Sequence, residues 1–229
     1  MPELSQGAEP RTVNDVLLRE EFRREVIRKC IHLSSIAIPI FYFFTPRTTA
    51  LVVSAALMVI ALALDFGRHY YPPLFRVYHA IFGSLLRTHE SDALVKRLNG
   101  GTYVLIAATL SIFIFPKLIA ITSFLILIVS DLAAALVGRK FGRRKFLGKS
   151  IEGSAAFFVT AVLVIAATPK VGYEAGEYAV GAVAALAGTL VEASAGNIDD
   201  NLSVPLAVGL TLLAGYAFFL PSLDIYKFG

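Results

Sequence analysis

The residues best suited to chemistry lie in one stretch, 131–153, which reads DLAAALVGRKFGRRKFLGKSIEG. It opens with a carboxylate, Asp131, at the end of a long apolar run, and closes on Lys149, Ser150 and Glu152. Carboxylate oxygens are suitable ligands for Mg²⁺, and lysine and arginine neutralise phosphate. The stretch therefore predicts a phosphate-handling site at the edge of a hydrophobic segment.

Asp131 is the first candidate for a catalytic and metal-binding residue. An unpaired carboxylate at membrane depth costs about 2.5 kcal/mol or more, so such a residue faces a cavity, a metal ion or a basic partner. The alternative is an interfacial ion pair, for example with Arg139.

Three small residues follow Asp131 and are spaced four positions apart: Ala134, Gly138 and Gly142. This pattern is typical of close helix packing in membranes, and taken alone it favours that role. Because it lies between a carboxylate and a basic loop, it could also let phosphate approach the helix. We therefore include Gly138 and Gly142 among the nucleotide-binding candidates.

The segment Gly142–Ser150, GRRKFLGKS, is not a P-loop. A P-loop has four residues between the first glycine and GK[ST] and follows a strand, whereas this segment has five and follows an apolar helix. Its chemistry remains: Lys149 and Ser150 come just before a helix that we expect to start near Glu152, and helix N-termini favour anions. Positive charge at a membrane boundary is the alternative explanation for the basic residues.

A second polar group lies between the last two apolar runs, in the sequence VEASAGNIDDN. Carboxylates and amides suit Mg²⁺ and ribose hydroxyls, whereas the simpler explanation is a solvated loop that caps the next helix. Its candidate residues are Glu192, Asn197, Asp199, Asp200 and Asn201.

Two further groups are weaker candidates. Arg28, Lys29 and His32 stand where the first apolar run begins, and a substrate contact is about as well supported as snorkelling into the headgroup layer. Asn99 precedes two glycines at the start of another apolar run, which predicts either a helix cap or a backbone nest near a nucleotide.

These residues need a membrane scaffold to position them. The 229-residue chain is 56% hydrophobic and 17% charged, against roughly 45–50% and about 25% in soluble domains. We expect an all-α, polytopic transmembrane helical bundle: a disordered tail at 1–11, then a single membrane-embedded catalytic domain at 12–229. The prediction comprises about seven spans, 31–45, 48–64, 102–115, 118–138, 153–168, 177–191 and 203–220, plus an interfacial amphipathic helix at 74–87.

Charge predicts the orientation of this bundle. With the N-terminus cytoplasmic, 17 of the 21 Lys and Arg residues fall on the cytoplasmic side. We therefore expect a multi-pass integral membrane protein, of the plasma or inner membrane if bacterial, with its active site on the cytoplasmic side. The net charge of +4 reflects this topology and does not predict nucleic-acid binding. The single cysteine excludes an internal disulfide.

With these residues in view, the chain resembles the family of dolichol kinase, phytol kinase and CTP-dependent diacylglycerol kinase. The likeness is strongest in three segments, 28–35, 130–154 and 191–206. Dolichol kinases share Asp-x-x-Ala-x-x-x-Gly-x-x-x-Gly, followed by a Lys-Lys-Thr-x-Glu-Gly segment implicated in CTP binding. The matching positions here are Asp131, Ala134, Gly138, Gly142, Lys149, Glu152 and Gly153.

Two positions depart from that pattern: Gly148 replaces the first lysine and Ser150 replaces the threonine. The departures affect the choice of nucleotide more than the fold. The family is also similar to phosphatidate cytidylyltransferases in its C-terminal half, but their long signature, with a KD pair and a PGHGG-type segment, is absent.

The resemblance implies transfer of the γ-phosphate of a nucleoside triphosphate, CTP, to the hydroxyl of a lipid alcohol such as phytol, a polyprenol or dolichol, or diacylglycerol, with Mg²⁺ as cofactor. The catalytic candidates are Asp131, Lys149, Glu152 and Asp200; the nucleotide-binding candidates are Gly138, Gly142, Arg139, Arg144, Lys149, Ser150, Asn99 and Asn201; the metal candidates are Asp131, Asp199 and Asp200; the substrate candidates are Arg28, His32 and Glu192.

The expected partners are the lipid alcohol, the nucleotide and the bilayer, with a homodimer left open and no nucleic acid. One alternative is a phosphatidate cytidylyltransferase that makes CDP-diacylglycerol. Another is a non-enzymatic transporter, which would carry charged groups at broken helices near the bilayer midplane rather than at one surface.

Overall fold

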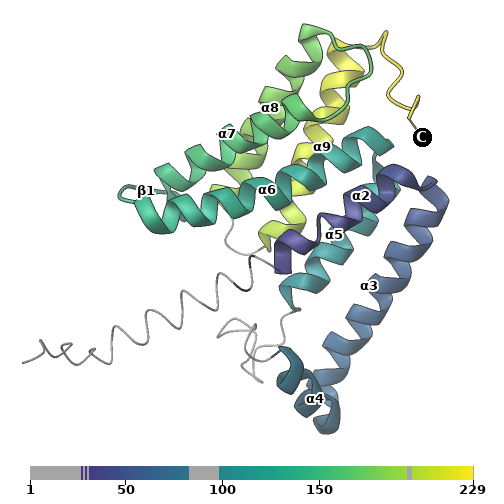
Figure 1. Cartoon of the computed structure of the whole chain (residues 1–229), viewed down its shortest axis with the longest axis vertical. Coiled ribbons are helices and arrows are strands. Elements are labelled where there is room, and N and C mark those ends of the chain that lie inside the picture. The colour runs from purple at the N-terminus through teal and green to yellow at the C-terminus, as the bar shows by residue number, and fades with distance from the viewer. Residues whose placement is uncertain (1–26, 28, 30, 83–97, 195–197, 229) are drawn as a thin grey trace, which may run out of the picture.

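The computed structural model describes residues 27, 29, 31–82, 98–194 and 198–228, so the predicted tail at 1–11 lies outside the described residues. Helices dominate the fold (Figure 1). They are α2 (Ala37–Phe44), α3 (Arg47–Tyr70), α4 (Pro72–Phe82), α5 (Gly100–Ile114), α6 (Lys117–Phe141), α7 (Ile151–Ala167), α8 (Ala175–Ser194) and α9 (Asp200–Phe219), and the strands are β1 (Lys145–Phe146) and β2 (Lys149–Ser150).

Several helix boundaries follow from local chemistry. Pro46 and Pro116 precede α3 and α6, because proline disfavours helical backbone in the residue before it but starts a new helix well. Asn99, Ser150 and Asp199 occupy the N-cap positions of α5, α7 and α9, and each side chain accepts a backbone N–H two or three residues on.

Helix α6 is the centre of the bundle and packs against α2, α5, α7 and α9. In its most apolar window 72% of the residues are buried, against 17% in the corresponding window of α3. Helix α3 packs on α5 and leads to α4 at the lower end of Figure 1, away from the group formed by α6 to α9. The site candidates on α6, α8 and α9 thus belong to the densest part of the molecule.

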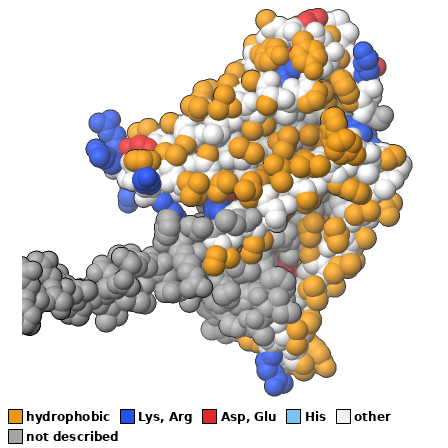
Figure 2. All heavy atoms as spheres, viewed as in Figure 1, with side chains coloured by type: hydrophobic (Ala, Val, Ile, Leu, Met, Phe, Trp, Pro, Cys, Tyr) orange, Lys and Arg blue, Asp and Glu red, His pale blue; other side chains and the backbone are white. Residues whose placement is uncertain are grey.

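Among the described residues, three helices are long and apolar enough to cross a membrane: Arg47–Arg68, Lys117–Phe141 and Asp200–Phe219. Shorter apolar helices cover Ile31–Phe44, Gly100–Ile114 and Ile151–Ala167. Hydrophobic side chains cover much of the sides of the bundle in Figure 2, as expected for a membrane protein. Each of the seven predicted spans coincides with a helix, whereas the number that cross the bilayer and the cytoplasmic N-terminus stay predictions.

The structure corrects one part of the all-α prediction. The segment 139–149 is not simply a basic loop: α6 continues to Phe141, and residues 145–150 form an antiparallel hairpin that pairs Lys145 with Ser150. Its turn places Leu147 in the left-handed region, at φ 52°, which is uncommon outside glycine. Helix α4 covers residues 74–82 of the predicted interfacial helix and begins two residues earlier, whereas residues 83–87 lie outside the described residues and the interfacial location stays a prediction.

Candidate functional site

Asp131 lies within α6 and is 5% exposed. Its Oδ2 is 2.5 Å from the Nζ of Lys29 and 3.6 Å from the Nε2 of His32. Lys29 and His32 are three residues apart, so they share one face of a helical turn. The carboxylate predicted to need a partner therefore has a basic one, but it comes from the start of the chain rather than from Arg139.

Lys149 forms ion pairs with two residues of the second polar group, Glu192 and Asp200. Its Nζ lies 2.5 Å from Glu192 Oε1 and 3.1 Å from Asp200 Oδ2. Glu192 belongs to the last turns of α8, and Asp200 is the first residue of α9. Residues that are 43 and 51 positions away from Lys149 in the chain thus meet at one ammonium group.

The hairpin explains how Lys149 reaches this position. Cross-strand pairing sets Lys149 opposite Phe146, and the backbone N–H of Gly148 donates to the carbonyl of Ala193 at 3.0 Å. On the other side, the hydroxyl of Ser150 accepts the N–H of Gly153 at 3.1 Å and caps α7. Lys149 is therefore held between the end of α8 and the start of α7, and Ser150 serves as a cap.

The two ion-paired groups share one electrostatic environment. Burial alone lowers the pKa of Lys149, but Asp200, Glu192 and, more weakly, Asp131 outweigh that effect, so its pKa is raised above the ordinary 10.5. The cluster contains three carboxylates and two ammonium groups, which leaves one net negative charge when His32 is neutral. Its members are Asp131, Glu192, Asp200, Lys29 and Lys149. Such a cluster suits a cation-bound phosphate better than an uncharged ligand.

The raised pKa of Lys149 predicts how its contribution to stability depends on pH. A group whose pKa is higher in the folded state stabilises the fold fully below its ordinary pKa, and that stabilisation is lost as pH rises through the folded-state pKa. The melting-temperature gap between the wild-type protein and Lys149→Met should stay constant from about pH 7 to about pH 10 and close only above that. A gap that closed near pH 8 would contradict the raised pKa.

Glu192 presents an oxygen that the protein does not satisfy. The residue is 1% exposed, and its Oε2 has no hydrogen-bond partner among the described residues. Buried polar atoms in native proteins are nearly always hydrogen-bonded, and an exception needs an explanation. Because the other oxygen holds Lys149, Oε2 is the acceptor of the cluster that is open to a ligand.

The predicted metal trio of Asp131, Asp199 and Asp200 does not assemble. Asp199 caps α9, and its Oδ1 accepts from the backbone N and the Nδ2 of Asn201 at 3.0 and 2.7 Å. Across the part of the chain that the structure describes, no three His, Cys, Asp or Glu side chains are grouped to hold an ion. Mg²⁺ in nucleotide sites is usually held by one or two carboxylates plus phosphates, and Asp131, a buried carboxylate of the cluster, suits a site of that kind.

Glu152, a catalytic candidate, lies in the first turn of α7. Its side chain is partly exposed, and its carboxylate accepts the backbone N–H groups of Arg143 and Arg144, at 3.1 and 3.5 Å. The backbone N–H of Glu152 itself, followed by these two bonds, lowers the pKa of this carboxyl, and desolvation opposes the effect only in part. Glu152 thus closes the loop before the hairpin, and we find no contact between it and Lys149 in the described chain.

We therefore expect Glu152→Gln to behave differently from changes inside the cluster. The amide still accepts a hydrogen bond but loses its charge, so phosphorylation activity should fall by less than about tenfold. Steady-state rates on purified protein test this. A loss as large as that of Asp131→Asn would restore Glu152 to the catalytic set.

The glycines of the 134–142 pattern are explained by helix packing. A Cβ on Gly153 would lie 3.1 Å from the carbonyl of Ala134 and 3.3 Å from the Cα of Gly138. A Cβ on Gly142 would lie 2.9 Å from the hydroxyl of Ser150. These small residues let α6, α7 and the hairpin approach closely, and a nucleotide role for them stays a prediction.

The remaining candidates are distributed unevenly. Asn99 caps α5, and Asn201 faces the first turn of that helix, close to the cluster. Arg139 and Arg144 are exposed. Lys and Arg side chains gather on the left of Figure 2, where Figure 1 places the hairpin. Arg28 and Asn197 lie outside the described residues.

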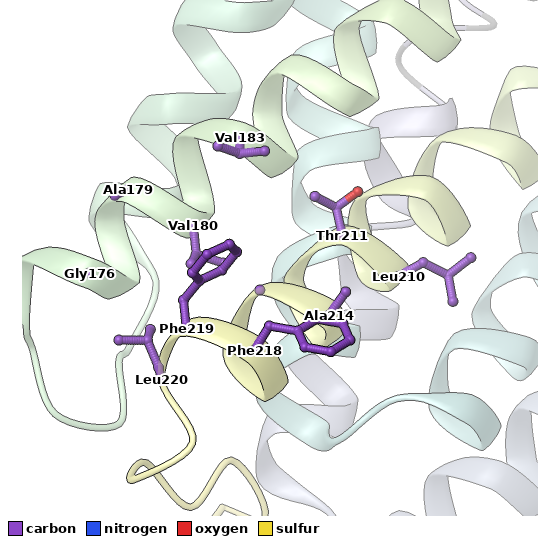
Figure 3. A pocket seen from close by; sticks show the side chains of 11 residues that line it. Gly176, Ala179, Val180, Val183, Leu210, Thr211, Ala214, Phe218, Phe219 and Leu220 are labelled. Carbon is purple, nitrogen blue, oxygen red and sulfur yellow. The ribbon is translucent and has the colours of Figure 1, made fainter.

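A cavity of about 670 Å³ opens between α8 and α9 (Figure 3). It reaches from Val183 and Leu210 to Gly176 and Leu220, at the ends of these helices opposite Glu192 and Asp200. Thr211 is the only lining residue with a polar side chain, and its hydroxyl donates to the carbonyl of Ala207 at 2.8 Å. Such a lining accommodates an alkyl chain and offers nothing to a phosphate.

Lys29 was named with Arg28 and His32 as a weaker candidate, but the substrate set kept only Arg28 and His32 of the three. Helical spacing does not separate Arg28 from Lys29, because positions four and three residues before His32 both share its helix face. Identifying the partner of Lys29 required the fold, since Asp131 is 102 residues away.

Comparison with known proteins now places the chain. No protein-family model matches it, and no solved structure matches it. An uncharacterized protein of Rickettsia prowazekii, RP860, is 35% identical over 84% of this chain and 95% of its own length. The chain therefore belongs to the family of RP860.

Two more distant relatives are characterised enzymes. The CTP-dependent diacylglycerol kinase 1 of Schizosaccharomyces pombe is 34% identical over 43% of this chain and 44% of its own length. The protein of the same name from Saccharomyces cerevisiae is 27% identical over 84% of this chain and 73% of its own length. These homologues support a membrane-bound lipid kinase, in agreement with the resemblance seen in the motifs.

Proposed function

We propose that the protein is an integral-membrane lipid kinase that transfers the γ-phosphate of CTP to the hydroxyl of a lipid alcohol. The observation that carries this proposal is the position of Lys149 between Glu192 and Asp200, in the same electrostatic environment as Asp131. The named activity of the two yeast relatives supports the donor and makes diacylglycerol the first acceptor to test.

The reaction needs positioning and neutralisation of charge more than covalent chemistry. Lys149 and Lys29 would bind phosphate oxygens, because each ammonium already lies within 3.1 Å of a carboxylate and can be shared with an incoming anion. Glu192 Oε2 would accept the proton of the lipid hydroxyl, since it is buried and has no hydrogen-bond partner among the described residues. Asp200 would keep Lys149 oriented.

Mg²⁺ would come with the triphosphate and be held by Asp131, while Glu192 keeps its role as the base. When bound, such an ion neutralises charge that develops on the phosphate oxygens. The lipid tail would lie among the apolar helices, and we propose that it enters beside α4. The apolar cavity between α8 and α9 can hold the far part of an extended tail, since about nine residues, or ~13 Å, separate Val183 from Glu192 along α8.

A donor and acceptor panel tests the proposal. Purified protein would be incubated with each of the four γ-labelled nucleoside triphosphates and with diacylglycerol, phytol or a polyprenol. We expect labelled lipid, with CTP the best donor. If no combination yields a labelled lipid, the kinase proposal fails.

A further inference from the structure

A buried ion pair lies at the end of α3, outside the cluster described above. Asp65 is 0% exposed and Arg68 is 3% exposed, and Asp65 Oδ1 lies 3.1 Å from Arg68 Nε. Removing two charges from water costs several kcal/mol per ion, which their attraction offsets only in good geometry. Only 17% of the residues in the most apolar part of α3 are buried. A fully buried ion pair on such a helix therefore indicates a role beyond packing.

Asp65 holds the first turn of α5 with its other oxygen. Oδ2 accepts the backbone N–H of Asn99 at 2.8 Å and the hydroxyl of Thr102 at 2.5 Å. The Asn99 side chain in turn accepts the N–H of Gly101 at 2.8 Å. Charge-assisted hydrogen bonds of this kind are roughly twice as strong as neutral ones, so Asp65 fixes where α5 begins.

The first turn of α5 in turn meets the start of α9. A Cβ at Gly100 would lie 3.6 Å from the Nδ2 of Asn201, which is ordinary van der Waals contact. Asn201 is buried, and its amide donates to Asp199. The adjacent residue, Asp200, accepts from Lys149. These hydrogen bonds, together with the packing of α5 on α9, therefore connect Asp65 on α3 to Lys149 in the hairpin.

We propose that Asp65 is a positioning residue for the phosphoryl-transfer site. It fixes the first turn of α5, against which Asn201 packs, and so holds Asp200 in register with Lys149. The consequence for catalysis rests on the proposed function. The positional claim, that Asp65 holds the first turn of α5 in place against the start of α9, does not depend on it.

The positional claim can be tested without any substrate. Cys30 is the only cysteine, so Cys30→Ser gives a background in which Gly100→Cys and Asn201→Cys form one defined pair for a short thiol crosslinker. We expect Asp65→Asn to lower the crosslinking yield by about fivefold or more, and Thr102→Val to lower it less. Thr102→Ser keeps the hydroxyl and should crosslink like the parent.

Glu177→Gln is the matched control, because Glu177 is also 1% exposed and accepts several backbone N–H groups, but at the other end of α8. It should leave the crosslinking yield unchanged. An unaltered crosslinking yield in Asp65→Asn would overturn the positional claim. So would an equal loss in Glu177→Gln, which would show a general loss of structure.

The catalytic consequence has its own readout. In the native-cysteine protein, Asp65→Asn should lower kcat by about tenfold or more with a smaller change in KM for the nucleotide, and Thr102→Ser should restore what Thr102→Val loses. An unchanged kcat in Asp65→Asn would overturn the catalytic part. If the wild-type protein labels no lipid, the proposed function fails, and the crosslinking pattern still decides the positional claim.

Discussion

Asp131→Asn should lower lipid phosphorylation by about a thousandfold or more while the protein still inserts and folds. Asp131 is the only member of the cluster that comes from the central helix α6, and its carboxylate is the counter-ion of Lys29 at 2.5 Å. An asparagine of the same size fills the space but removes the negative charge. Rates with γ-labelled CTP and diacylglycerol, together with gel filtration in detergent, measure both effects.

Glu177→Gln again supplies the control for this experiment. It removes a carboxylate that is 1% exposed and that accepts hydrogen bonds from three backbone N–H groups and from Tyr216. We expect a lower melting temperature and activity within a few-fold of the wild-type protein. Wild-type activity in Asp131→Asn would contradict the assignment of Asp131 to the site.

Lys149→Met should lower kcat by about a hundredfold to a thousandfold, the range seen when one preorganised donor to the reacting group is removed. The change removes the ammonium between Glu192 and Asp200 and leaves two carboxylates facing each other. Lys149→Arg should keep more activity than Lys149→Met, because it keeps the positive charge. It should still be slower than the wild-type protein, because a guanidinium is larger than the compact ammonium group. Single-turnover rates separate this loss from a change in nucleotide binding.

The double variant Lys149→Met with Glu192→Gln tests whether the two residues act as a unit. Groups that work together in one step lose far less in combination than the product of their separate losses. We expect the double variant to be about as slow as Lys149→Met alone. Losses that multiply would indicate that Lys149 and Glu192 act in independent places.

The positions of the helices could be predicted because their signals are local. Pro46 and Pro116 divide the apolar runs, and Asn99 caps the helix that follows it. Each of these effects depends on a few neighbouring residues, so no knowledge of the fold is needed. The same reasoning identified Asp131, Lys149, Glu192 and Asp200 as polar groups that need partners.

The pairing of those groups could not be predicted, since it depends on contacts between distant segments. Nothing in the sequence indicates that Lys149 bonds to Glu192, or that Lys29 approaches Asp131 across 102 positions. Asp199 was predicted to be a metal ligand because a sequence does not show which of several adjacent acidic side chains faces the site. In the structure its Oδ1 caps α9. The hairpin was missed because two-residue strands carry too few residues to show an alternating pattern.

The most direct measurement of the central claim uses CTP labelled separately at the α- and γ-phosphates, with purified protein in nanodiscs and diacylglycerol as acceptor. The account predicts that label enters the lipid from the γ-phosphate only, that CDP is released, and that Asp131→Asn removes the signal. Lipid labelled from the α-phosphate with release of pyrophosphate would identify a cytidylyltransferase instead, and would contradict the account.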